Sequence, residues 1–249
     1  GDTSGVTALM GAAGNGHERV VELLLQRGAE INKQDSDGWT ALMYAAGNGH
    51  ERVVELLLQR GAEINMQDSV SWTALMFAAT NGHERVVELL LRHGAEINLQ
   101  DSDSDTALMD AAFNGHERVV DLLIRRGAEI NLQNNDGNNA LTLAASEGHE
   151  RLVDPLIRRG AEINLQNSKC WTALMIAANW GQERVVDLLI RHGAEINLQS
   201  SVGGTALMDA AHSGHERVVE LLLQHGAEVD LQNSDGFTAL KLAAKYGHE

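Results

Sequence analysis

The apolar and polar residues of this chain follow a pattern that repeats every 33 residues. Each repeat contains the tetrapeptide Thr-Ala-Leu-Met or a close variant and, one residue later, two alanines. Because threonine and asparagine are good helix N-cap residues, this segment predicts a short helix that begins directly after the cap. The eight cap positions are Thr7, Thr40, Thr73, Thr106, Asn139, Thr172, Thr205 and Thr238.

A second helix is predicted over residues 51–59 and at the equivalent positions of the other repeats. Its valines and leucines fall on one broad face and its charged residues on the other. Gly49 ends the first helix, as a left-handed C-cap requires, and Gly61 ends the second. The Ala-Glu-Ile-Asn and Asp-x-x-Gly segments that follow are typical of turns.

Helices of about nine residues are not stable alone in water. Stacked on identical neighbours, however, their Leu, Val and Ala faces form one extended core, which needs few aromatic residues. No linker or change of composition interrupts the array, so we predict a single domain over residues 1–249. Its units span approximately 2–34, 35–67, 68–100, 101–133, 134–166, 167–199, 200–232 and 233–249, the last one truncated.

The segment from Asp35 to Asn65, with the pattern D-x-x-G-x-T-A-L-M-x-A-A-x-x-G-H-x-x-V-V-x-L-L-L-x-x-G-A-x-I-N, resembles the ankyrin repeat family. The resemblance covers essentially the whole chain. It implies a mainly α solenoid with a helix-turn-helix and a β-turn or hairpin loop in each repeat, curved, with a concave face formed by turn tips and first helices. T-A-L-M replaces the usual T-P-L-H, and alanine lacks the pre-set φ of proline, so we expect softer helix starts but the same fold.

A second departure from the repeat is Pro155, which stands where other copies have leucine. It lies beyond the first turn of its helix, where proline removes a hydrogen bond at a cost of about 3 kcal/mol. We therefore expect a kink or a late helix start in the fifth unit.

The copies differ mainly in the turn before the cap, four residues after it, and at the end of the first helix, and all the aromatic residues lie at such positions. Large rings on a display surface are typical of interface hot spots. For the residues four after the cap, packing between units is an equally good interpretation, and Trp39 and Trp72 fit either packing or partner contact. The predicted partner-binding residues are Trp39, Tyr44, Trp72, Phe77, Asp105, Asp110, Phe113, Trp171, Ile176, Trp180, Asp209 and Phe237.

The formal net charge is −16, which argues against a nucleic-acid partner. Asp103, Asp105 and Asp110 concentrate acid in the fourth unit, and Asp110 and Asp209 replace apolar residues on first helices. This surplus either steers a partner with a basic patch towards units three to five or is a solvated surface.

Catalytic and metal-binding motifs are not formed by the repeated residues, and we predict neither enzyme activity nor a cofactor. The recurring Gly-His-Glu-Arg-Val-Val never becomes H-E-x-x-H, so its histidine is expected to hydrogen-bond a neighbouring loop. His212 and His215 lack a carboxylate or thiolate partner for a metal, and Gly11–Gly16 has the wrong spacing for a dinucleotide loop. Cys170 is expected to be an exposed thiol at a turn.

The function predicted from these features is a non-catalytic scaffold that binds a protein partner. Two alternatives stay open: an engineered or selected binder, and a substrate of an asparaginyl hydroxylase. The second rests on the resemblance of Leu24 to Asn32 to that enzyme's motif, which recurs at Asn65, Asn98, Asn131, Asn164 and Asn197.

The ends, the single cysteine and the hydropathy of the chain add three expectations. The start lacks Met, which suggests a processed or excised piece, and neither end has a polar cap, so we expect end-to-end self-association. One cysteine favours a reducing, intracellular compartment, and no segment is apolar enough for a membrane span or laid out as a signal peptide.

Overall fold

The computed structural model describes residues 4–248, which contain fifteen α-helices and no β-strand. The chain divides into two compact units, unit 1 (Gly1–Glu129) and unit 2 (Ile130–Glu249), which are described separately. The helices of unit 1 are α1 (Ala8–Gly14), α2 (Glu18–Gln26), α3 (Ala41–Gly47), α4 (Glu51–Gln59), α5 (Ala74–Thr80), α6 (Glu84–Arg92), α7 (Ala107–Phe113) and α8 (Glu117–Arg125). Those of unit 2 are α9 (Ala140–Ser146), α10 (Glu150–Arg158), α11 (Ala173–Asn179), α12 (Glu183–Arg191), α13 (Ala206–Ser213), α14 (Glu216–Gln224) and α15 (Ala239–Tyr246).

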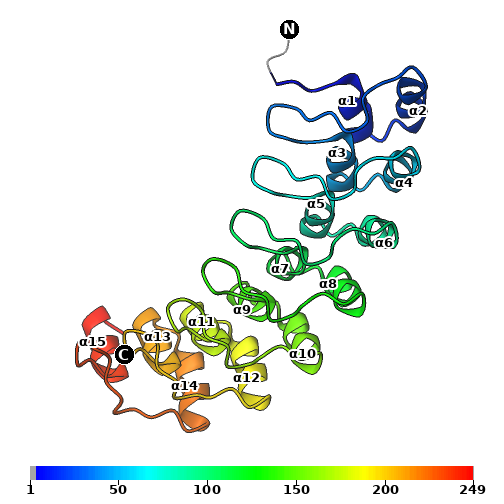
Figure 1. Cartoon of the computed structure of the whole chain (residues 1–249). Coiled ribbons are helices and arrows are strands. Elements are labelled where there is room, and N and C mark those ends of the chain that lie inside the picture. Colours follow the sequence, from blue (N-terminus) through cyan, green and yellow to red (C-terminus); the bar gives the residue numbers. More distant parts are fainter. Residues whose placement is uncertain (1–3, 249) are drawn as a thin grey trace. The chain divides into compact units, whose positions relative to one another are not determined.

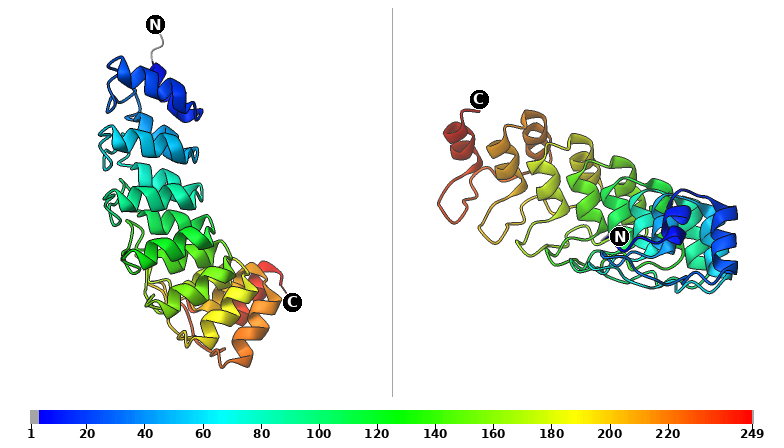
Figure 2. Two further views of the ribbon diagram at one scale, coloured as in Figure 1. Left: turned by 90° about the vertical axis from the view of Figure 1, so that its right-hand side faces the viewer. Right: turned by 90° about the horizontal axis from the view of Figure 1, so that it is seen from above.

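Each unit is built from helix pairs that stack in the order of the sequence. Within each unit, a first helix packs on the second helix of its pair and on the first helix of the next pair, as α3 does on α4 and α5. In unit 1 the first helices form one row and the second helices another, and the turns project beyond the first helices (Figures 1 and 2). The predicted α-helical solenoid is therefore confirmed within each unit.

The first helices begin where the cap residues predicted. The hydroxyl of Thr40 accepts a hydrogen bond from the backbone N–H of Met43 at 3.3 Å, and the Sδ atom of Met43 accepts one from the N–H of Thr40 at 3.4 Å. Met43 thus completes a reciprocal cap that usually needs a polar side chain. In the fifth repeat Asn139 and Thr142 replace this pair and form the same two bonds.

Pro155 does not delay its helix, so the predicted late start is wrong. Helix α10 runs over Glu150–Arg158, the same stretch that α12 covers in the next repeat, with Pro155 inside it. Pro155 is exposed, so its ring meets solvent rather than core side chains. The helix is held by the burial of Leu152, Val153 and Leu156 on its inner face.

The repeated histidine forms the predicted bond to the preceding repeat. The Nε2 atom of His50 lies 2.9 Å from the carbonyl oxygen of Gly14, and His83 makes the equivalent contact with Gly47 at 3.0 Å. Where glutamine replaces histidine, the Nε2 of Gln182 donates to the carbonyl of Ser146. Since a carbonyl only accepts, Nε2 of each histidine carries the hydrogen.

An asparagine ladder forms a second link between repeats. Asn32 accepts from the N–H of Glu63 at 2.9 Å and donates to its carboxylate at 3.0 Å. Other rungs join Asn65 to Glu96 and Asn164 to Glu195. This hydrogen bonding accounts for the recurrence of the asparagine that the hydroxylation hypothesis uses.

Two glycines of unit 2 differ in the space around them, and the difference reports how closely neighbouring turns pack. Gly137 and Gly193 both have a left-handed backbone, with φ of 77° and 87°. A Cβ atom on Gly137 would lie 2.5 Å from the backbone nitrogen of Ser168, whereas one on Gly193 would meet nothing within 4 Å. Gly193→Ala is expected to lower stability by about 1–2 kcal/mol, the cost of the left-handed conformation alone. Gly137→Ala is expected to cost clearly more in a urea titration, and equal losses would contradict this packing.

Candidate functional site

In unit 1, four of the predicted partner-binding residues pack against one another. The Trp39 ring lies 5.1 Å from Tyr44 and 4.3 Å from Phe77 of the next repeat, and Trp72 lies 5.0 Å from Phe77 (centroid distances). Phe77 is only 7 % exposed. These contacts give the four residues a packing role, and Trp39, Tyr44 and Trp72 are also partly exposed.

Hydrogen bonds fix the polar ends of this aromatic group. The Tyr44 hydroxyl donates to Oδ2 of Asp35 at 2.8 Å, and the Trp72 indole N–H donates to Oδ2 of Asp101 at 2.8 Å. Burial, followed by the Asp35 carboxylate, raises the pKa of Tyr44 to about 12. Asp35 also accepts from the backbone N–H groups of Asp37 and Trp39, which forms an Asx turn in a segment predicted to be a turn.

Asp110 occupies the position on α7 that Phe77 occupies on α5. Its Oδ2 atom is buried and has no hydrogen-bond partner. Burial, with smaller contributions from the charges of Asp105 and Asp101, raises the pKa of Asp110 to about 8. Asp110 is therefore largely protonated at neutral pH and adds little to a negative field.

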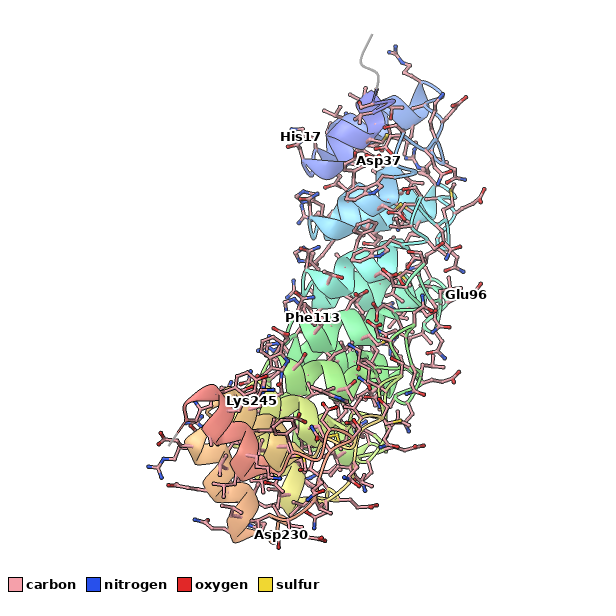
Figure 3. The ribbon with its side chains drawn as sticks, turned by 90° about the vertical axis from the view of Figure 1, so that its left-hand side faces the viewer. His17, Asp37, Glu96, Phe113, Asp230 and Lys245 are labelled. Atoms are coloured by element: carbon pink, nitrogen blue, oxygen red, sulfur yellow. The ribbon has the colours of Figure 1, made fainter. Side chains whose placement is uncertain are left out.

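Two other predicted residues of unit 1 lie near the surface. Phe113, at the end of α7, is 45 % exposed (Figure 3). Asp105 is partly exposed, and its backbone N–H is bound by the carboxylate of Asp101. Phe113 and Asp105 thus have surface available to a partner.

In unit 2 the predicted residues separate into a buried and an accessible group. Ile176 is only 8 % exposed, so packing is its main role. Trp180, the C-cap residue of α11, is 63 % exposed, the largest exposed aromatic surface in the described part of the chain. Trp171 and Phe237 are partly exposed at turns two repeats apart, and each donates its N–H to the asparagine that heads its turn.

Asp209 and its surroundings form a cavity that sequence reasoning did not predict. Oδ2 of Asp209 is buried without a partner, and burial raises the pKa of Asp209 to about 7. His212 and Lys245, which had not been predicted as site residues, line the same cavity. The sequence signal for this cavity is Gly204. The residue before the cap is larger in every other repeat, and in four of them it is tryptophan or phenylalanine.

A second cavity, of about 520 Å³, lies along α14 and α15. Leu240 on α15 lines it and is 78 % exposed, whereas its counterpart Leu207 on α13 is buried. This apolar surface agrees in kind with the expected self-association, which stays a prediction.

Among residues 4–248, no group of three His, Cys, Asp or Glu side chains could hold a metal ion. Cys170 lies at a turn with φ of 56° and is only partly exposed, less so than expected. None of the fifteen helices described is long and apolar enough to cross a membrane.

The stacked helix pairs, reciprocal caps and side-chain links between neighbours define a helical repeat protein. The family model for ankyrin repeats, which describes three copies at a time, matches residues 1–68, 65–134, 108–200 and 174–249. The chain therefore belongs to the ankyrin repeat family, as the resemblance implied. Ankyrin repeats are generally protein–protein interaction modules. A comparison with curated proteins gives no match.

Proposed function

We propose that this chain is a non-catalytic module that binds a protein partner through its first helices and turns. The observation that carries the proposal is Trp180, which exposes 63 % of its surface at the end of a first helix. Exposing a large aromatic ring costs free energy, and such rings supply much of the energy of protein interfaces. Family membership supports the same function.

The acidic composition of the chain favours a partner of opposite charge. With a net charge of −16, the chain favours proteins with a basic surface and repels nucleic acid. The single cysteine favours a reducing, intracellular compartment for this interaction. The exposed apolar surface at Leu240 supports self-association as an additional property.

Substitution of Trp180 tests the proposal, because this ring can be removed without opening the core. Trp180→Ala is expected to lose proteins that the wild-type chain captures from cells, with affinity for a purified partner falling by at least about 2 kcal/mol, the usual size of a hot spot. Affinity capture followed by titration with the purified partner measures this.

The matched control for Trp180→Ala is Leu23→Ala. Leu23 is also an exposed apolar residue, but it lies on α2, a second helix, and not on the first helices or turns. Capture should be unchanged in this variant. Equal capture by the wild type and Trp180→Ala would argue against the proposed face, whereas Trp39→Ala would be ambiguous because Trp39 also packs on Phe77.

A further inference from the structure

Unit 2 contains a cavity of about 320 Å³ that is lined by the turns at residues 200–204 and 233–237 and by the helices α13 and α15. That volume is at the small end of the range for ligand pockets, so it suits one side chain rather than a folded domain. Lys245, near the end of α15 (Figure 3), is one of the residues that line this cavity. The residues that matter for its chemistry are Trp171, Gly204, Asp209, Phe237, Lys245 and Tyr246.

The cavity exists because the seventh repeat has no side chain before its cap. In the second repeat this position is Trp39, whose ring covers Tyr44 of its own first helix. In the seventh repeat it is Gly204, and a Cβ atom there would lie 3.7 Å from Oδ1 of Asp209. The missing side chain therefore leaves room directly beside a carboxylate.

This carboxylate is incompletely satisfied. Oδ2 of Asp209 is buried with no hydrogen-bond partner. A buried, unpaired carboxylate is costly, and burial raises its pKa to about 7. A cation placed in the cavity would offset that cost.

The aromatic rings of the cavity already attract a cation from the chain itself. The Nζ atom of Lys245 lies 4.7 Å from the centre of the Phe237 ring and 5.4 Å from that of Tyr246. These distances are within the range of cation–π attraction. Lys245 forms no ion pair with Asp209 in the described part of the chain, so its charge leaves the carboxylate uncompensated.

We infer that this cavity binds the guanidinium group of an arginine side chain from the protein partner, with Asp209 as its counter-ion and the rings of Trp171 and Phe237 as flanking surfaces. A planar guanidinium can pair with a carboxylate through two N–H groups and stack on aromatic rings, which an ammonium cannot do. Lys245 then acts as an internal competitor for the ring faces. The inference rests on the proposed function, because it names the side chain that the partner would insert.

The test uses small probes on the whole chain, so it needs no identified partner. N-acetyl-arginine methylamide is titrated while the Asp209 carboxyl carbon and the Gly204 amide are followed by NMR. Saturable shifts at both are expected, together with a lower pKa of Asp209 at saturation. The citrulline analogue, which has the same shape without the charge, and the lysine analogue are both expected to bind more weakly.

Three variants and one control sharpen the result. Asp209→Asn is expected to weaken the arginine probe at least about tenfold, and Gly204→Trp, which restores the residue of other repeats, should close the cavity. Gly204 has no left-handed backbone, and a Cβ atom there would lie 3.1 Å from Oγ of Ser200, so that hydroxyl must shift slightly to admit a side chain. Lys245→Gln should tighten binding, whereas Lys241→Gln, at a lysine outside the cavity lining, should leave it unchanged.

Several outcomes would overturn the inference. These are equal binding of the arginine and citrulline probes, lysine binding as tight as arginine, or no loss with Asp209→Asn in a variant that keeps its wild-type amide spectrum. The two proposals fail separately: a probe that does not bind, with capture still dependent on Trp180, removes only the arginine pocket. A probe that binds, with capture independent of Trp180, removes only the proposed partner face.

Discussion

Asp110→Asn is expected to raise the stability of the chain strongly at pH 8–9 and hardly at all near pH 4. The pKa of Asp110 is about 8 in the folded chain, against 3.8 for an unperturbed aspartate. Between these two values the folded state binds more protons than the unfolded state, so this group lowers stability as pH rises. Well above pH 8 the buried charge costs on the order of 6 kcal/mol, at about 1.4 kcal/mol for each pKa unit.

The measurement is the difference in free energy of unfolding between variant and wild type across this pH range. Asp110→Leu is a useful second variant, because the position of Asp110 is occupied by leucine in two other repeats, at Leu143 and Leu242. Asp103→Asn removes an exposed carboxylate of the same repeat and should have little effect. A gain from Asp110→Asn that is the same at pH 4 and pH 9 would show that the charge of Asp110 is not the cause.

Pro155→Leu is expected to stabilise the chain by about 3 kcal/mol, the cost of a proline inside a helix. Helix α10 keeps its full length around Pro155, which has no N–H to donate to the carbonyl four residues earlier. Because Pro155 is exposed, the gain comes from the backbone rather than from added burial. Calorimetry should show a higher melting temperature.

The reverse change provides the control for this prediction. Leu188→Pro introduces proline at the equivalent position of α12 and is expected to lower stability by a similar amount. A melting temperature of Pro155→Leu at or below that of the wild type would mean that α10 has adapted to its proline.

The elements that depend on local chemistry could be predicted from the sequence. The Thr40 cap, the turn at Asp35 and the bond from His50 to the previous repeat all follow from residues that recur at a fixed spacing. The structure adds the role of Met43, whose sulfur atom replaces the polar partner of a capping box. Helix starts in this chain are therefore specified by a pair of residues rather than by threonine alone.

Contacts between different repeats could not be predicted in the same way. Trp39 contacts Phe77, which lies 38 residues later, because its turn packs against the first helix of the next repeat. The variable positions of the sequence do not reveal that offset, so for Phe77 packing and partner contact stayed equally good interpretations until the structure showed it buried. The same offset places Trp171 and Asp209 at one cavity, which no single repeat indicates.

The histidine bond between repeats has a consequence for substitution at this position. The Nε2–H of His50 donates to the carbonyl of Gly14, and in the sixth repeat the amide of Gln182 makes the same contact with Ser146. Either side chain can therefore link two repeats, because the link needs an N–H donor rather than an imidazole. The response of the chain to rising pH is set instead by Asp110 and Asp209, whose buried carboxyl groups are costly to ionise.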